Sequence, residues 1–361
     1  MKKNKIKQII IPIFLPQYGC KHRCVYCNQY ETTLIKDVLN PEEVHNFIEN
    51  ELDKIKSDKK FYDIQIAFYG GSFTALSQNI QKDYLNAIMP FKEEGLIAGI
   101  RVSTRPDAIS QDVLDNFKVF NNVVIEIGAQ TFNDSILKLI QRNHSSTDIE
   151  NAINLVKKYQ FKVGIHLMVN LPGESPEMAF ESANKVVKQK PDFVRIHPTL
   201  VFPNTLLETW FLNGFYKPWD EEATIELLIR LLDLFESNQI PVIRMGLQRA
   251  FKDRKPWRVV AGFDHPSLRE IVETRRFFKK IYEKIRMLYE KYSPQIEKIG
   301  VLDITLLVHP DYLSRFVGYQ KENRKKITEL FPNFRFTFKA DEKIAEGDFE
   351  IEIKSRKNLL N

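Results

Sequence analysis

Cys20-Lys-His-Arg-Cys24-Val-Tyr-Cys27 is the stretch around which the chain is organised, because its eight positions hold all three cysteines of a 361-residue sequence. Three thiolates at the spacing C-x3-C-x2-C can ligate three irons of a four-iron four-sulfur cluster and leave the fourth iron without a protein ligand. An ordinary electron-transfer cluster of this type takes four cysteines. The pattern therefore indicates a cluster with one open position, which can bind a substrate as an open catalytic zinc does.

Two other uses of clustered cysteines fit this pattern less well. A disulfide would leave one thiol over, and a structural zinc needs a fourth ligand, for which His22 is poorly placed and the other histidines are remote in sequence. Buried free cysteines are common singly and much less so as a triplet at this spacing. We therefore expect Cys20, Cys24 and Cys27 to be the metal ligands of a catalytic cluster.

Length and composition predict a globular chain with one large domain and a smaller one, since 361 residues exceed the usual ~100–200 residues per domain. No apolar run approaches the ~18 residues of a membrane span, so we expect no membrane association. The apolar run near the N-terminus contains Pro12 and Pro16, lacks a small-residue cleavage site and leads straight into the cysteines. It indicates a buried first strand rather than a signal peptide, and the reduced cysteines then predict a cytoplasmic protein.

Short apolar runs predict six buried strands, at residues 8–15, 63–69, 98–104, 122–128, 162–169 and 192–197. Amphipathic stretches between them predict helices at 41–56, 78–91, 110–117, 133–141, 147–159 and 177–188. Asn40-Pro41 and Ser175-Pro176 are typical helix beginnings. The predicted fold class is α/β, a partial (β/α)6 TIM-like barrel over residues 1–250, followed by a small α+β C-terminal domain over residues 251–361.

Unusual residues follow each predicted strand, and in barrels the chemistry lies at the C-terminal ends of the strands. The six ends are expected to meet at one mouth. After the cysteines come Tyr69-Gly70-Gly71-Ser72, Ser103-Thr104-Arg105-Pro106-Asp107, Gly128-Ala129-Gln130, His166-Leu-Met-Val-Asn170-Leu-Pro-Gly173-Glu174 and Arg195-Ile-His197-Pro198.

The cysteine spacing, with Tyr26 before the last cysteine, resembles that of the radical S-adenosylmethionine (SAM) superfamily, in which the open iron chelates the amino and carboxylate groups of SAM. The resemblance implies that the Gly70-Gly71 turn receives the methionine amino group and that Leu171-Pro172-Gly173 shapes the adenine slot. Gln130 can hydrogen-bond ribose hydroxyls, and Arg142 can bond the methionine carboxylate. The further expected SAM contacts are Tyr26, Ser72, Ser103, Arg105 and His166. Taken alone, the glycine pair would indicate an ordinary turn and Arg142 a surface arginine.

Within that superfamily, the segments FYGGSFT, STRPD, GAQTF, HLMVNLPGE and RIHPTLV resemble the radical SAM half of the elongator catalytic subunit, which modifies wobble uridines of tRNA. The likeness covers roughly residues 8–250. Ser103 stands where that family has a glutamate, and Val169 replaces a proline. The compact cysteine spacing is closer to the coproporphyrinogen oxidase type. Nothing after residue 250 resembles an acetyltransferase domain, so the carboxymethylation reaction is not carried over, and with no further cysteines only one cluster is possible.

The basic excess of the chain lies entirely in its last third. Residues 251–361 carry 24 Lys/Arg against 17 Asp/Glu, a net charge of +7, whereas residues 1–250 carry 29 against 30. After a basic linker we expect a long helix whose apolar residues face inward, then a strand at 301–308, a helix at 312–330 and two strands around Phe336 and Ile351. The inward residues expected on the long helix are Leu268, Ile271, Phe278, Ile285 and Leu288.

The resemblance implies an enzyme that reductively cleaves SAM to a 5′-deoxyadenosyl radical, with reduced flavodoxin or ferredoxin as electron donor. RNA, specifically tRNA, is the expected substrate, because the core resembles that of elongator and the basic C-terminal third places basic residues beside aromatic ones. The basic residues are Arg244, Arg249, Lys252, Arg254, Lys255 and Arg258, beside Phe251 and Trp257. The alternative is an enzyme or haem-handling protein of the coproporphyrinogen oxidase type, acting on a small molecule, with His166 and His197 as candidate haem ligands.

Overall fold

A computed structural model describes residues 7–35, 37–55, 62–247 and 258–354. The chain forms two compact units, residues 1–264 and residues 265–361.

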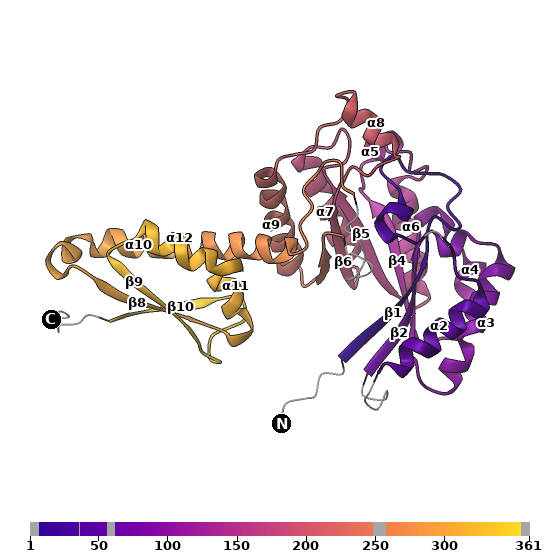
Figure 1. The fold of residues 1–361 in the computed structure, drawn as a ribbon, viewed down its shortest axis with the longest axis horizontal. Coiled ribbons are helices and arrows are strands. Elements are labelled where there is room, and N and C mark those ends of the chain that lie inside the picture. The colour runs from indigo at the N-terminus through magenta and orange to yellow at the C-terminus, as the bar shows by residue number, and fades with distance from the viewer. Residues whose placement is uncertain (1–6, 36, 56–61, 248–257, 355–361) are drawn as a thin grey trace. The chain divides into compact units, whose positions relative to one another are not determined.

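The first unit is a parallel sheet of seven strands in the order β1-β2-β3-β4-β5-β6-β7 (Figure 1). The strands are β1 (Lys7–Leu15), β2 (Tyr62–Gly70), β3 (Gly99–Thr104), β4 (Asn122–Gln130), β5 (Lys162–Val169), β6 (Phe193–Pro198) and β7 (Val242–Met245). Every strand neighbours the next one along the chain, and β1 and β7 stand at the two ends of an open half-barrel. The prediction of an α/β partial barrel is confirmed, and its six strands match β1 to β6 within two residues.

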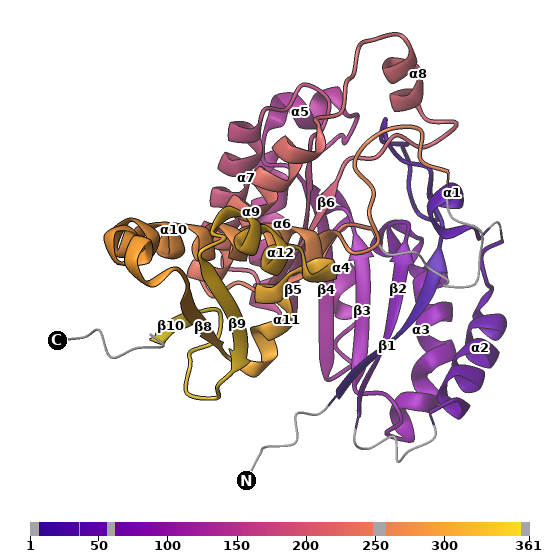
Figure 2. The same cartoon turned by 60° about the vertical axis from the view of Figure 1, so that its left-hand side comes forward.

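Helices connect the strands of the half-barrel (Figure 2). They are α1 (Gln29–Thr33), α2 (Pro41–Asp53), α3 (Gln78–Glu93), α4 (Gln111–Asp115), α5 (Asp134–Leu139), α6 (Ser146–Lys158), α7 (Pro176–Gln189), α8 (Leu206–Leu212) and α9 (Glu221–Ser237). The expected helix beginnings are confirmed. The side chains of Asn40 and Ser175 accept hydrogen bonds from the backbone N–H groups of Glu43 and Met178, and a proline follows each of the two caps.

The sequence did not indicate α1, α8, α9 or β7. Strand β7 is only four residues long, Val-Ile-Arg-Met, which is too short for a period-two pattern to stand out. It pairs with the edge of β6. This seventh strand lengthens the wall of the half-barrel beyond Arg195.

Strand alternation separates an apolar outer face from a polar interior. Ile125 and Ile127 of β4 are fully buried, as are Val163 and Ile165 of β5, and residues of this kind make up the core. Glu126, between the two isoleucines of β4, and His166, directly after Ile165, lie on the opposite face of their strands, toward the inside of the half-barrel. The interior of the sheet is therefore where chemistry-bearing side chains collect.

The second unit packs one long helix, α10 (Leu268–Ile299), against a three-stranded sheet in the order β10-β8-β9 (Figure 2). Strand β8 (Leu302–Val308) is parallel to β9 (Phe334–Ala340) and antiparallel to β10 (Phe349–Lys354). The expected small α+β module is confirmed.

Two expectations for this unit are wrong in detail. The single helix expected at 312–330 is split into α11 (Leu313–Val317) and α12 (Glu322–Leu330), because Gly318, Gln320 and Lys321 have positive φ angles. In the first two-thirds of α10 the buried apolar side chains are Leu268, Val272, Phe277, Ile281 and Ile285. The expected inward residues Phe278 and Leu288 are only partly buried, because the apolar stripe follows steps of four and five residues rather than seven.

Candidate active site at the carboxyl ends of the strands

The cysteine loop follows β1 and is tied to three other parts of the half-barrel. Ser72 N–H donates to Tyr18 O at 2.9 Å, which joins the loop to the end of β2. Val25 N–H donates to Ile140 O at 3.2 Å, and Leu207 N–H donates to Val25 O at 2.8 Å. Backbone hydrogen bonds of this kind fix the loop without using any side chain that a ligand would need.

Gly70 and Gly71 allow the end of β2 to approach the cysteine loop. A Cβ on Gly71 would lie 1.9 Å from Tyr18 O, and Gly70 has a φ of +104° with Leu15 O 3.1 Å from its Cβ position. Gly71 N–H donates to Leu15 O at 2.8 Å. The close approach of the two backbones therefore requires glycine at these positions, which an ordinary turn would not.

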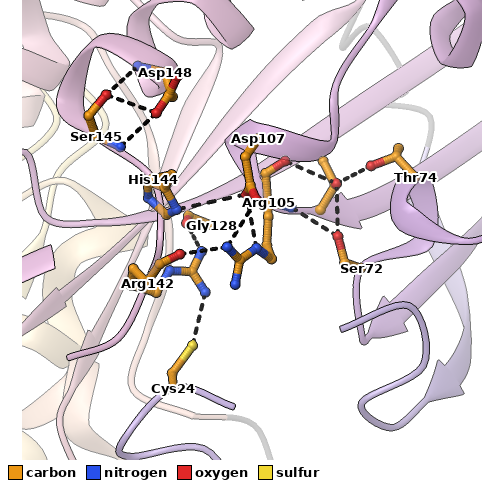
Figure 3. A network of polar contacts seen from close by, with 11 residues as sticks. Cys24, Ser72, Thr74, Arg105, Asp107, Gly128, Arg142, His144, Ser145 and Asp148 are labelled. Atoms are coloured by element: carbon orange, nitrogen blue, oxygen red, sulfur yellow. Dashed lines mark hydrogen bonds and ion pairs between the residues drawn. The ribbon is translucent and has the colours of Figure 1, made fainter. Parts of the chain in front are cut away.

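Arg142 is a buried residue next to the cysteines, not a surface arginine. Its Nη1 donates to Cys24 Sγ at 3.3 Å, its Nη2 donates to Gly128 O, and only 6% of its surface is exposed (Figure 3). Its Nε is buried without a hydrogen-bond partner in the described part of the chain. A buried guanidinium with an unused N–H indicates a site for an anionic group.

Arg105 is held largely by the protein itself. Its Nε and Nη2 donate to the Asp107 carboxylate at 2.9 and 3.0 Å, and Nη2 also donates to Arg142 O at 2.5 Å (Figure 3). Only Nη1 is buried without a partner among the described residues. Arg105 therefore supports the backbone of Arg142 and has one N–H group left for a ligand.

His144 lies beside this network and was not indicated by the sequence. Its Nδ1 is 3.9 Å from Asp107 Oδ1 (Figure 3). Burial, followed by the charge of Arg142, lowers the pKa of His144 to about 4, so the imidazole is neutral at pH 7. A cationic His144 would repel the Arg142 guanidinium. The neutral ring occupies the same space without that electrostatic repulsion.

The other predicted SAM contacts lie along the same edge. Ser72 Oγ is 3.3 Å from Thr104 Oγ1 and accepts from Arg105 N–H at 3.3 Å. Gln130 has a φ of +69° and lies beyond a register irregularity at the end of β4. The Tyr26 hydroxyl is buried without a hydrogen-bond partner among the described residues. A single cavity is lined by Cys20, Cys24, Cys27, Tyr26, Gly70, Gly71, Ser103, Arg105, Gln130, Arg142 and His166.

That cavity has a volume of about 870 Å³ and extends from the cysteine loop down the inside of the half-barrel to Gln8 and Lys162. At mid-depth, Glu126 is fully buried and accepts from Tyr69 Oη at 2.8 Å and from Arg101 at 3.1 Å. His166 Nε2 lies 2.7 Å from its Oε2, and Arg195 Nε lies 2.9 Å from the same oxygen. The position predicted to contact SAM, His166, is thus engaged with a carboxylate.

The Glu126 carboxylate is charged in this setting. Burial alone would raise its pKa, but the hydrogen bond and charge of His166 and the charge of Arg195 lower it well below its usual range. The sequence did not indicate Glu126. The available signal was one charged residue inside the apolar run Val123–Ile127, at an inward position of a central strand.

The three thiols are crowded together. Burial and the neighbouring Cys24 thiol raise the pKa values of Cys20 and Cys27. A metal cation among them would favour the thiolates, since coordination deprotonates a thiol outright. With three free cysteines, Arg142 directed at Cys24 Sγ and unpartnered buried donors alongside, the residues present fit a cluster with a bound anionic ligand.

Comparison with known proteins assigns the family. The model of the radical SAM superfamily matches residues 14–186, and the model of the radical SAM C-terminal domain matches residues 191–277. The chain belongs to the radical SAM superfamily. It is therefore a radical SAM enzyme, and the cysteine loop, Arg142 and the carboxyl ends of β1 to β5 fall within the first matched region.

Relatives of this radical SAM enzyme include proteins with tRNA in their names. It is 30% identical over 183 residues to the tRNA uridine(34) acetyltransferase of Dehalococcoides mccartyi, covering 49% of this chain and 39% of that protein. It is 24% identical to Elongator complex protein 3 of Saccharomyces cerevisiae, covering 84% of this chain and 59% of that protein. The solved Elp3 of Methanocaldococcus infernus has the same fold, with a TM-score of 0.57 at 23% identity, covering 78% of this chain and 64% of that one. The chain thus spans only part of these relatives.

Most of the basic linker lies outside the described residues, namely Arg249, Phe251, Lys252, Arg254, Lys255 and Trp257. Arg258 is described and exposed. Arg244 belongs to β7 and lines the cavity rather than an outer surface. His197 lies on β6 with its ring 5.8 Å from that of His166. None of the described helices is long and apolar enough to cross a membrane.

We predict that Gly71→Ala prevents normal formation of the cluster site, because the new Cβ would collide with Tyr18 O at 1.9 Å and push the loop away from β2. Overpacking of this kind costs about 1–3 kcal/mol of unfolding free energy. Iron bound per protein after anaerobic reconstitution is the measurement. Gly95→Ala is the control, since Gly95 has a positive φ of +71° that Gly71 lacks, but no atom lies within 4 Å of its Cβ position. Equal iron content in the two variants would contradict this role of Gly71.

A second prediction concerns Glu174, which is buried at the end of the Leu171-Pro172-Gly173 loop. Its Oε2 accepts from Leu171 N–H at 3.1 Å, and burial raises its pKa to about 8. Between its ordinary pKa of 4.5 and about 8, the folded protein keeps a proton that the unfolded chain loses. The free energy of unfolding should therefore fall with rising pH, by about 1.4 kcal/mol per pH unit in that window.

Glu174→Gln removes this titration, so the variant should gain stability relative to the unsubstituted protein from pH 5 to pH 8. Urea unfolding at several pH values measures the difference. Glu177→Gln, at an exposed carboxylate on α7, is the matched control. It should lose stability with rising pH in the same way as the unsubstituted protein, because Glu174 is still present. If Glu174→Gln and the unsubstituted protein lose stability in parallel across that range, the buried carboxyl is not protonated.

Proposed function

We propose that this radical SAM enzyme cleaves SAM reductively at a four-iron four-sulfur cluster and uses the resulting radical to modify RNA, with tRNA as the substrate. The single observation that carries the proposal is the constellation of three clustered cysteines and the buried Arg142 at the strand ends of the half-barrel. The cluster is held by Cys20, Cys24 and Cys27. When bound, the cluster and SAM supply one electron and a 5′-deoxyadenosyl radical.

The residues of the chain bind and orient SAM in this proposal. Arg142 and the free N–H of Arg105 bond the methionine carboxylate, while Gln130 bonds the ribose. The Gly70-Gly71 turn receives the methionine amino group, and Leu171-Pro172-Gly173 borders the adenine. Tyr26, Ser72, Ser103 and His166 complete the proposed set. Of these residues, His166 contributes from the deeper part of the cavity, because its Nε2 lies within hydrogen-bond distance of the Glu126 carboxylate.

Apolar residues that line the same cavity exclude water from the radical. Phe14, Met168, Leu200 and Phe202 contribute to this lining. A dry cavity protects a reactive intermediate and strengthens the electrostatic interactions inside it. The protein's contribution is therefore orientation, charge and exclusion of solvent, while the cofactors carry the difficult chemistry.

The choice of tRNA is supported by the names of the relatives and by charge. The tRNA uridine(34) acetyltransferase of Dehalococcoides mccartyi is 30% identical to this chain over 183 residues, which are 39% of its own length. Residues 251–361 carry the net charge of +7, which suits contact with a phosphate backbone. In this proposal residues 1–250 carry out the radical chemistry and residues 251–361 contact the tRNA. Reduced flavodoxin or ferredoxin supplies the electron, and the protein works in the cytoplasm.

The cluster assignment predicts the outcome of cysteine substitution. Anaerobic reconstitution of the unsubstituted protein should give about four iron and four sulfide per chain. Each of Cys20→Ala, Cys24→Ala and Cys27→Ala should lose most of both, because each removes one ligand. Arg142→Ala should retain iron and sulfide but bind SAM more weakly. This difference distinguishes the cysteine ligands of the cluster from a residue that contacts SAM. Stoichiometric zinc without sulfide would contradict the assignment.

The substrate assignment predicts a change in cellular tRNA. Nucleosides from the tRNA of a strain lacking the gene should differ from those of the parent in one modified nucleoside, measured by mass spectrometry. A plasmid copy of the unsubstituted gene should restore that nucleoside, and a Cys24→Ala copy should not. Identical nucleoside profiles in all four strains would exclude tRNA and favour a small-molecule substrate.

A further inference from the structure

The three cysteines differ in their surroundings, because the protein directs a charged donor at one of them. Arg142 Nη1 donates to Cys24 Sγ at 3.3 Å (Figure 3). Among the described residues, Cys24 is the only cysteine whose sulfur accepts a side-chain hydrogen bond. Cys24 is also buried, whereas Cys20 and Cys27 are partly exposed. The three expected ligands of the cluster are therefore not equivalent.

The Arg142 side chain is held at Cys24 by contacts that need no cofactor. Its Nη2 donates to Gly128 O, its backbone N–H donates to Leu137 O at 2.9 Å, and its backbone O accepts from Arg105 Nη2 at 2.5 Å. Gly128 leaves room for the guanidinium, since a Cβ there would lie only 3.3 Å from Arg142 Nη2. A donor fixed in this way is preorganised for the sulfur in front of it.

Tyr26 brings a second donor to the same sulfur. Its hydroxyl is buried and makes no hydrogen bond of normal geometry within the described part of the chain. Burial raises the pKa of this hydroxyl well above its usual range, and the next largest cause is the charge of Cys24. A buried donor without a partner is unfavourable, and a charged acceptor forms a stronger hydrogen bond than a neutral one. The Cys24 thiolate of a bound cluster is such an acceptor.

Hydrogen bonds to the cysteine sulfurs, together with net charge and burial, set the reduction potential of an iron-sulfur cluster. Reduction adds one negative charge to the cluster and its thiolates. Donors that point at a thiolate, and a guanidinium that is always charged, stabilise this added charge more than they stabilise the oxidised state. The low dielectric constant of a buried site strengthens both effects.

We propose that Arg142 and Tyr26 act through the sulfur of Cys24 to raise the reduction potential of the bound cluster, so that the external electron donor can reduce it. This inference rests on the proposed function, which supplies the cluster, and does not depend on the identity of the substrate. It leaves the SAM contact of Arg142 in place, because Arg142 Nε is a separate N–H group that has no partner among the described residues.

A redox titration of the full-length, anaerobically reconstituted protein tests the inference. The reduced fraction is followed by electron paramagnetic resonance, and SAM is left out because Arg142 is also proposed to bind it. Arg142→Met should lower the equilibrium constant for one-electron reduction at least tenfold, which is a shift of about 59 mV to lower potential. Arg142→Lys, which keeps the charge but loses the fork of donors, should shift the potential less. Tyr26→Phe should also shift it downward.

Tyr216→Phe is the matched control for Tyr26→Phe. Tyr216 is buried as well, but its hydroxyl donates to Asn170 O at 2.7 Å rather than facing a thiol. This variant should keep the potential of the unsubstituted protein. Iron and sulfide per chain are measured for every variant, because a purely structural role would lower the cluster content and leave the potential of the loaded fraction unchanged.

The outcomes separate this inference from the proposed function. If Arg142→Met fails to load, Arg142→Lys and Tyr26→Phe decide. Loaded Arg142 and Tyr26 variants that titrate at the potential of the unsubstituted protein would overturn the inference and leave the proposed function standing, as would a shift in Tyr216→Phe equal to that in Tyr26→Phe. An unsubstituted protein that takes up neither iron nor sulfide would overturn both.

Discussion

The close backbone contact between the cysteine loop and the end of β2 is the constraint on which the site depends. Gly71 allows it, because any side chain there would overlap Tyr18 O, and the Ser72 to Tyr18 hydrogen bond at 2.9 Å maintains it. Two further bonds, through Val25, tie the loop to Ile140 and Leu207. The cysteines are thereby fixed relative to Arg142 and the other strand ends before any cofactor binds, which lowers the entropy cost of assembling the site.

The half-barrel divides into two chemical levels. At the strand ends, thiols and the Arg142 guanidinium suit a metal cluster with an anionic ligand. Deeper inside, Glu126 holds Arg101, Arg195 and His166 in one network. Both levels follow from strand alternation: outward residues such as Ile125 and Ile165 are fully buried in the core, which leaves the inward positions for polar groups.

The sequence predicted most of the first unit because each strand is a short apolar run ending in polar or glycine residues, as Tyr69-Gly70-Gly71 does. It also predicted Arg142 as a site residue. It did not predict Glu126, because partner residues on β2, β3, β5 and β6 are distant in sequence and only the folded sheet brings them together. Strand β7 was missed because four residues carry no readable period, and the break between α11 and α12 because positive φ at Gln320 and Lys321 has no clear composition signal.

The amount of 5′-deoxyadenosine formed from SAM tests the central claim most directly. The anaerobically reconstituted protein, reduced with dithionite, should convert SAM to equal amounts of 5′-deoxyadenosine and methionine, whatever its substrate. The Cys24→Ala variant under the same conditions should form neither. A fully loaded and reduced protein that leaves SAM intact would contradict the account, as would equal product from the Cys24→Ala variant.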